Sequence, residues 1–306
     1  MTSDPRGTGG FTEMDRHFAE FVSRLPGAGG PDVWMAAALV SHLTQKGHVC
    51  LDLTRYAGQP LPSGFVDSLT GETLPELNGW LNTLRRSAVV GEPGEFRPLI
   101  LDGANRLYLY RYWRYERRLV EFLKNRADSP AEICQPETLK RGLCRLFPSG
   151  GSDPDWQMIA ALVSVLRKFA VITGGPGTGK TSTVVKILVL LLEQAASSKF
   201  KIALAAPTGK AAARLKETVK LAKEHLDCSQ EILGLIPVEA STLHRLLGTM
   251  LNSTKFRHHR GNPLPYDAVV VDEASMVDLP LMAKLVDALH GECRLILLGD
   301  KDQLAS

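Results

Sequence analysis

Hydrophobic positions change their spacing near residue 155, and this change predicts two regions of different architecture. From about Phe11 to Leu123 the apolar residues recur mostly at helical spacing, as they do in Val33–Leu43. After Asp155, short β-rich runs alternate with helical stretches. The expected strands are Phe169–Thr173, Lys201–Ala206, Ala268–Asp272 and Arg294–Gly299, and the expected helices are Thr181–Gln194, Lys210–Leu226 and Leu279–His290.

The expected strands carry apolar residues on both faces, and helices separate them, which indicates a parallel sheet covered by helices on both sides. Between the two regions, residues 126–155 are rich in prolines, glycines and acids and end in PSGGSDPD, a composition typical of a linker. The sequence therefore predicts an α/β protein. We expect a mainly helical domain over residues 1–125, a linker over 126–155 and a parallel-sheet domain over 156–306.

Composition argues against several classes of protein. Of the 306 residues, 44% are hydrophobic and 23% charged, which is ordinary for a soluble chain long enough for two domains. The longest apolar run, Ile187–Leu192, is far shorter than the roughly 20 residues that span a bilayer. No secretory signal opens the chain, so we expect a cytoplasmic protein without a membrane partner. The five cysteines form no CxxC pair, which argues against a disulfide framework and a zinc or iron–sulfur site.

The net charge of +3 does not by itself indicate a nucleic-acid-binding protein. The charge is unevenly placed, however, because residues 101–118 hold five arginines against Asp102 and Glu116. This segment can contact phosphates, or it can be an ordinary amphipathic strand and helix.

The sequence GGPGTGKT directly follows an expected strand and opens an expected helix, which is the context that a phosphate-binding P-loop requires. Glycines let the backbone N–H groups turn toward phosphate oxygens, and the helix N-terminus adds its positive dipole end. Lys180 would reach the β- and γ-phosphates of ATP, and the Thr181 hydroxyl would ligate Mg²⁺. A glycine-rich turn without a ligand is disfavoured in this context. The predicted ATP-binding residues of the loop are Gly174, Gly175, Pro176, Gly177, Thr178, Gly179, Lys180 and Thr181.

Two further apolar strands deliver polar residues to the same edge of the predicted sheet. The segment VVVDEAS ends in Asp272, which would hold Mg²⁺, and Glu273, which would orient and deprotonate the attacking water. In LLGDKDQLAS, the uncharged amide of Gln303 would sense the γ-phosphate without cancelling the metal charge. Taken singly, a strand ending in Asp-Glu marks only a sheet edge, and Gly-Asp is a frequent turn pair.

Weaker signals precede and follow these motifs. Gln157 lies 17 residues before Gly174, where its amide can pair with the donor and acceptor edge of adenine. In APTGKAAARL, Thr208 and Lys210 stand at a strand-to-helix turn that can approach a nucleic-acid backbone closely. The alternative for this turn is an ordinary helix N-terminus with a solvated lysine.

Thr242 and His244 belong to STLHRLLG, a capping residue followed by an apolar helical run. A single histidine on a short helix is more often structural than catalytic, and no Cys or Glu partner indicates a metal here. The basic segment KFRHHRGNPL that follows can lie along DNA or form a solvated loop.

These motifs, in this order, resemble those of superfamily 1 helicases. The amino-acid sequences of the motifs are similar to those of the RecD family, the alpha subunits of bacterial exodeoxyribonuclease V. These motifs are GGPGTGKT, APTGKAAARL, STLHRLLG, DEASMVDLPLM and LLGDKDQLAS. The amino-terminal segments LVSHLTQKGHVCLDL and PLILDGANRLYLYRYWRYERRL resemble the first domain of that family. The resemblance therefore covers nearly the whole chain and implies a RecA-like motor domain over residues 156–306.

The resemblance implies a 5′-to-3′ DNA helicase that works with the beta and gamma subunits of exodeoxyribonuclease V at double-strand breaks in recombinational repair. It implies that Gln157 contacts adenine, that Lys180, Glu273 and Gln303 take part in catalysis, and that ATP and Mg²⁺ are the cofactors. Thr208, Lys210, Thr242 and His244 fall in motifs that line the single-stranded DNA path in the family. The first domain is chiefly a docking module for the gamma subunit.

The sequence ends at Ser306, inside the motif that contains Gln303, and such helicases use a second RecA-like domain to supply arginines to the γ-phosphate. We therefore expect this chain to bind ATP weakly, to hydrolyse it poorly and not to unwind DNA. One alternative is an assembly subunit that uses nucleotide as a switch; intact Lys180, Asp272 and Glu273 favour the motor. A different P-loop enzyme, such as a kinase, would lack the motifs around Thr208 and Gln303.

Overall fold

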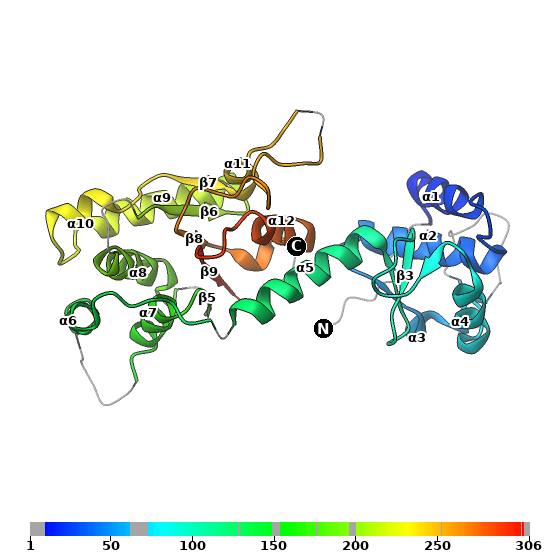
Figure 1. The fold of residues 1–306 in the computed structure, drawn as a ribbon, viewed down its shortest axis with the longest axis horizontal. Coiled ribbons are helices and arrows are strands. Elements are labelled where there is room, and N and C mark those ends of the chain that lie inside the picture. Colours follow the sequence, from blue (N-terminus) through cyan, green and yellow to red (C-terminus); the bar gives the residue numbers. More distant parts are fainter. Residues whose placement is uncertain are drawn as a thin grey trace. The chain divides into compact units, whose positions relative to one another are not determined.

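The computed structural model describes residues 10–61, 73–127, 129–148, 154–175, 177–195, 200–251, 253–300 and 302. The chain divides into two compact units, Met1–Arg117 and Arg118–Ser306. Helix α5 (Tyr110–Arg126) contributes residues to both units (Figure 1). Among the described residues, no helix is long and apolar enough to cross a membrane.

The first unit combines helices with a small sheet. Its helices are α1 (Glu13–Ser23), α2 (Pro31–Gln45), α3 (Leu53–Tyr56) and α4 (Leu77–Arg86), and its strands are β1 (Leu51–Asp52), β2 (Val90–Gly91), β3 (Leu99–Leu101) and β4 (Arg106–Leu109). The strand order is β1-β4-β3-β2, with β2 parallel to β3 and the other pairs antiparallel. Helix α2 lies at the centre of this core, because its residues 35–43 are all buried. Mainly helical character was predicted here, whereas this sheet was not.

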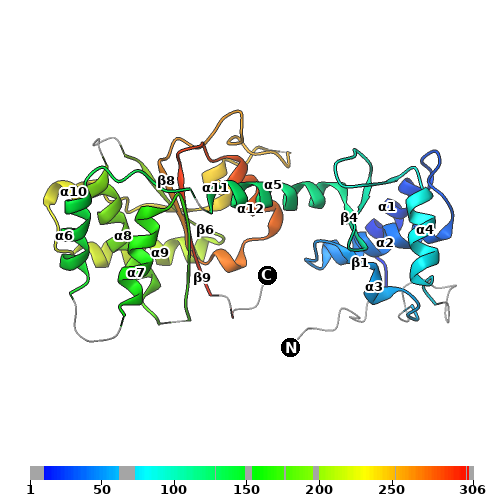
Figure 2. The ribbon, with the colours of Figure 1, turned by 60° about the horizontal axis from the view of Figure 1, so that its bottom comes forward.

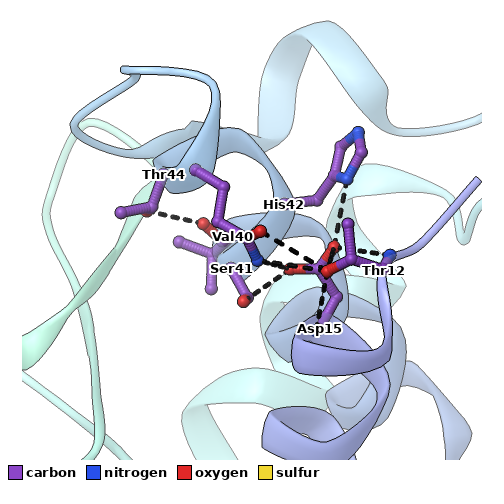
Figure 3. A network of polar contacts seen from close by, with 7 residues as sticks. Thr12, Asp15, Val40, Ser41, His42 and Thr44 are labelled. Carbon is purple, nitrogen blue, oxygen red and sulfur yellow. Dashed lines mark hydrogen bonds and ion pairs between the residues drawn. The ribbon is translucent and has the colours of Figure 1, made fainter. Parts of the chain in front are cut away.

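A buried carboxylate joins α1 to α2 (Figure 3). Asp15 is fully buried, and its oxygens accept hydrogen bonds from Ser41 Oγ at 2.7 Å and Gln45 Nε2 at 2.6 Å. His42 Nδ1 lies 3.1 Å from the same carboxylate. The Thr12 backbone N–H also donates to Asp15, while Thr12 Oγ1 caps α1, so the two form a capping box. This network satisfies a charge that would otherwise be costly to bury.

The second unit is built on a parallel sheet of strands β5 (Phe169–Thr173), β6 (Ile202–Ala206), β7 (Ala240–Thr242), β8 (Ala268–Val271) and β9 (Arg294–Gly299). The strand order is β5-β9-β8-β6-β7, and every pair is parallel. Its helices are α6 (Pro136–Leu146), α7 (Trp156–Leu166), α8 (Lys180–Gln194), α9 (Gly209–Lys223), α10 (Gln230–Leu235), α11 (Leu243–Leu247) and α12 (Leu279–Asp287), with a 3₁₀ turn at Ala274–Met276. The predicted parallel-sheet architecture is confirmed.

Helices cover both faces of this sheet (Figure 2). One face packs Leu204, Val270 and Ile296 against α6, α7, α8, α9 and α10. The other face packs Val269 and Leu295 against α11, α12 and the carboxy-terminal part of α5. Because successive residues of a strand point to opposite faces, β8 is apolar and buried along its whole length, and Leu295, Ile296 and Leu298 of β9 are buried between the two helical layers.

The segment that the composition predicted as a linker, residues 126–155, contains helix α6, and this helix packs in the core of the second unit. Leu139 and Leu146 of α6 are buried in the core beside α8. Arg126 is buried as well and donates to the backbone oxygens of Cys293, His290 and Gly291, the last two at 2.6 and 2.9 Å. The compact units therefore divide between Arg117 and Arg118 rather than beyond residue 125.

Replacing Asp15 with asparagine should destabilise the first unit, because an amide turns one acceptor oxygen into a donor facing other donors. We expect a loss of about 2–3 kcal/mol, measured by urea denaturation, since hydrogen bonds to a charged group are lost. The matched change Glu13→Gln removes an exposed carboxylate from the same helix and should leave the midpoint nearly unchanged. Equal effects of the two substitutions would contradict a stabilising role for the buried network.

Candidate functional site

A cavity of about 350 Å³ opens at the carboxyl ends of strands β8 and β9, beside the start of α8. Its lining comes from the loop before α8, the first turn of α8, one side of α9 and the residues that follow the two strands. The lining residues are Gly177, Gly179, Lys180, Thr181, Ser182, Arg214, Thr218, Asp272, Glu273, Ser275, Gly299 and Asp300. The cavity thus brings together the loop glycines, Lys180, Thr181 and the Asp272–Glu273 pair, which lie about 90 residues apart in the chain.

The loop before α8 adopts a backbone that requires glycine. Gly177 and Gly179 both have a φ of 78°, in the left-handed region. Gly179 is the N-cap of α8 and has no side chain to accept from the first-turn N–H groups. In contrast, side-chain oxygens cap α7, α9, α10, α11 and α12. The N–H groups at the start of α8 are therefore available to an anion in the cavity.

Lys180 lies over its own loop. Its ammonium donates to the backbone oxygens of Gly174 and Gly175, the latter at 2.8 Å. A phosphate group would compete for this ammonium, because a charged acceptor binds it more strongly than a carbonyl does. Gln157 supports the loop from α7: its Nε2 donates to the Thr178 carbonyl at 3.1 Å.

The two carboxylates at the end of β8 differ in environment. Burial raises the pKa of the Asp272 carboxyl above its ordinary value, although the Glu273 backbone N–H, Lys180 and Arg214 oppose this shift. Glu273 has a φ of 52°, a left-handed conformation that is uncommon for a residue with a side chain. Strain of this kind is typical of functional sites, and Glu273 lines the cavity.

Several lining residues were not among the predicted site residues: Ser182, Arg214, Thr218, Ser275, Gly299 and Asp300. Asp300 is only 6% exposed and follows β9 directly. The Ser275 hydroxyl is buried without a hydrogen-bond partner among the described residues, and the backbone of Ser275 packs closely on Gly299. Arg214, Ser275, Gly299 and Asp300 fall within motifs that the sequence singled out, whereas Ser182 and Thr218 carried no such signal.

The four predicted DNA-contact residues lie outside this cavity lining. Thr208 caps α9 by accepting from Ala211 N–H at 3.2 Å, and Thr242 caps α11 in the same way. The strands that precede them, β6 and β7, are neighbours whose ends are paired in register. Lys210 and His244 are exposed. Pro176 and Gln303 lie outside the described residues.

The donor set fits a small hard cation. The Thr181 hydroxyl and the Asp272 carboxylate line the same cavity, and oxygen ligands of this kind suit a divalent metal that also binds phosphate and water. The described residues contain no cluster of three His, Cys, Asp or Glu side chains, so they offer no protein-only cage for a metal. Such a metal would depend on the phosphates for much of its coordination.

The fold and the site define the class: this is a P-loop nucleotide-binding α/β protein with an additional amino-terminal domain. The family model of the RecBCD enzyme subunit RecD, N-terminal domain, matches residues 8–108, and an AAA domain model matches residues 157–306. The chain belongs to the RecD family.

Relatives support this assignment along most of the sequence. The chain is 40% identical over 296 residues to the RecBCD enzyme subunit RecD of Mycolicibacterium smegmatis, which covers 95% of this chain and 50% of that protein. It is 39% identical to the same subunit of Haemophilus influenzae, with 89% and 45% covered. It is 33% identical to the ATP-dependent RecD2 DNA helicase of Deinococcus radiodurans, with 66% and 25% covered. The chain spans about half the length of the RecD relatives it matches.

Among solved structures, T4 UvsW aligns at a TM-score of 0.40 and 12% identity, covering 64% of this chain and 43% of that one.

Gly179→Ala should strain the loop, because the new Cβ would sit in a left-handed conformation 2.6 Å from Gln157 Nε2. We expect a loss of about 1–2 kcal/mol in thermal or urea denaturation. Gly175→Ala is the matched control in the same loop, since a Cβ there would meet no atom within 4 Å. If both variants unfolded at the same denaturant concentration, the left-handed requirement at Gly179 would be refuted.

Asp272→Asn should raise the melting temperature of the ligand-free chain at neutral pH. A carboxyl whose pKa is raised on folding opposes folding while it is ionised, so removing the charge favours the native state. The gain should shrink as the pH falls through the raised pKa toward the ordinary value of 3.8, where the carboxyl is protonated in both states.

The control for this measurement is Glu292→Gln. The hydrogen bond from Lys168 lowers the pKa of the Glu292 carboxyl, so its charge favours folding and its removal should bring no gain. A fall in melting temperature for Asp272→Asn at neutral pH would contradict the desolvation of Asp272.

Proposed function

We propose that this chain forms an ATP-binding part of a DNA helicase that moves 5′ to 3′ on single-stranded DNA. The observation that carries the proposal is the single cavity in which the uncapped start of α8 and Lys180 face Asp272 and Glu273. A site that only held nucleotide would need the loop and the lysine, but it would not need a carboxylate beside the metal ligand. The RecD relatives support a DNA substrate.

Each side chain has a distinct role in this proposal. Lys180 and the α8 N–H groups bind the β- and γ-phosphates, while Thr181 and Asp272 hold Mg²⁺. Glu273 orients the attacking water and accepts its proton. Gln157, whose Nε2 donates to the Thr178 carbonyl, would contact the adenine. The side-chain amide of Gln303 would contact the γ-phosphate.

A bound Mg²⁺ would supply positive charge to the γ-phosphate as negative charge moves toward the leaving β-phosphate. The chain contributes the fixed positions of the groups around it, because α8 and β8 are both held in the core. Positioning and electrostatics of this kind account for most of the catalysis in phosphoryl transfer.

Single-stranded DNA would run along the carboxyl ends of β6 and β7. Thr208 and Thr242 are caps of the helices that begin there, and Lys210 and His244 are exposed beside them. The backbone N–H groups and the lysine at such an edge suit a phosphate backbone. The DNA path and the ATP cavity would then lie at the same edge of one sheet.

The amino-terminal unit would dock on the gamma subunit of exodeoxyribonuclease V, with the beta subunit completing a complex that acts at double-strand breaks in recombinational repair. Support comes from the RecD N-terminal family model over residues 8–108 and from relatives named as RecBCD subunits. A cytoplasmic location follows from this role.

The second candidate is a nucleotide-dependent assembly subunit without motor activity. The hydrogen-bonded Asp15 carboxylate of the first unit and the uncapped start of α8 would serve that role equally well. Glu273 separates the two functions, because only hydrolysis needs a base at that position.

Single-turnover hydrolysis of labelled ATP by excess chain, with and without single-stranded DNA, tests the proposal. We expect measurable binding and slow turnover, since among the described residues only Lys180 and Arg214 bring positive side chains to the cavity. Lys180→Ala should weaken ATP binding, while Glu273→Gln should keep binding and lose turnover. Removing a general base typically costs about 10²–10⁴ in rate.

Two outcomes would change this assignment. Turnover by Glu273→Gln equal to that of the unchanged chain would favour the assembly role. Rapid DNA-stimulated turnover by the unchanged chain would show that no further domain is needed for hydrolysis.

A further inference from the structure

Helix α9 contributes to the lining of the cavity that also contains residues of the phosphate loop. Arg214 and Thr218 both line the cavity and lie four residues apart, so they share one side of the helix. The adjacent residues Leu215 and Val219 are fully buried in the core. Packing of these two apolar residues fixes the rotation of α9 and therefore holds Arg214 on the cavity side.

The Arg214 guanidinium is exposed, and its side chain has no hydrogen bond or ion pair within the described part of the chain. Lys216, two residues later on the same helix, differs because its ammonium pairs with Glu239 at 2.6 Å. The charge of Arg214 nevertheless acts on the site, since it opposes the rise that burial causes in the pKa of the Asp272 carboxyl. Arg214 is thus a cation without a side-chain acceptor at the metal-binding end of the cavity.

The charges of the lining indicate what such a cation would bind. Asp272, Glu273 and Asp300 are acidic, and the positive side chains of the described lining are Lys180 and Arg214. Lys180 belongs to the start of α8 and Arg214 to α9, and both positive charges act on Asp272. A triphosphate in the cavity would meet both charges, with the α8 N–H groups beside the lysine.

We propose that Arg214 binds the terminal phosphate of a nucleoside triphosphate and thereby distinguishes it from a diphosphate. The inference rests on the proposed nucleotide site and assigns a specificity residue within it. The end of the cavity at Asp272 is where the metal and the γ-phosphate would lie, and Arg214 faces that end. A guanidinium can donate two parallel hydrogen bonds to a phosphate, which a lysine cannot do.

The alternative ligand for Arg214 is the DNA backbone, because Lys210 lies one helical turn earlier on α9. The cavity lining favours the nucleotide: it includes Arg214 and Thr218 from the second and third turns of α9, whereas Lys210 is outside it. The Thr218 hydroxyl donates to the Arg214 backbone oxygen at 3.0 Å, so Thr218 is engaged within the helix.

Isothermal titration of the 306-residue chain with ATP and with ADP, both in Mg²⁺, tests the assignment. Arg214→Ala should weaken ATP binding about tenfold and ADP binding less than about twofold, because a charge-assisted contact to the third phosphate is lost. Arg214→Lys should fall between these values. Lys220→Ala is the matched control, since it removes an exposed positive charge from the same helix outside the cavity.

The outcomes separate this inference from the proposed function. The role of Arg214 is refuted, and the nucleotide site stands, if the unchanged chain binds both nucleotides and Arg214→Ala weakens ATP binding and ADP binding equally. The same holds if Arg214→Ala weakens the binding of neither nucleotide. If Arg214→Ala weakens only single-stranded DNA binding, measured by fluorescence anisotropy, the DNA alternative replaces it. If the unchanged chain binds neither nucleotide, the proposed function fails and this inference fails with it. Thermal denaturation of each variant checks that the fold is retained.

Discussion

Helix α8 is enclosed by the sheet on one side and by α6, α7, α9 and α10 on the others. Its buried positions run from Thr183 to Leu192 with only Lys186 less covered, so the helix is apolar nearly all round. Each buried leucine contributes about 1.5–3 kcal/mol, whereas an uncapped N-terminus forgoes only about 1 kcal/mol. The core can therefore hold α8 in place while its first turn remains open toward the cavity.

With α8 and β5 both fixed, the loop between them must turn sharply within a few residues. The left-handed glycines Gly177 and Gly179 make that turn possible, and Gln157 supports it from α7. The same edge carries two further unfavourable local features, namely the left-handed Glu273 and the half-buried Asp272, whose pKa is raised by burial. Unfavourable local features concentrate where a ligand would interact with them, and the surrounding core offsets their cost.

Long periodic elements were predictable from the sequence, and short ones were not. Strands β5 and β9 have the predicted ends, and each contains a run of four apolar residues, Phe169–Ile172 and Leu295–Leu298. Strands β1 to β3 have two or three residues each, too few for a period to emerge, whereas β4 falls in the segment that could be an amphipathic strand and helix. Helix α6 was hidden in a segment rich in proline and glycine, although Leu139, Leu143 and Leu146 repeat at helical spacing. Composition is a weaker guide to a boundary than this periodicity.

The residues of the candidate site likewise differ in how far the sequence predicts their role. Residues 174–181 and the Asp272–Glu273 pair are contiguous motifs, so their chemistry can be inferred without the fold. Arg214 falls within the motif APTGKAAARL, but the motif does not indicate what this side chain contacts, and the spacing from Thr218 shows only that the two residues share a side of α9. Leu215 and Val219 decide which side that is, because they must enter the core. Once α9 packs beside α8, the residues just before these two are directed to the cavity. A cation placed by tertiary packing can therefore complete a site whose other parts are contiguous motifs in the sequence.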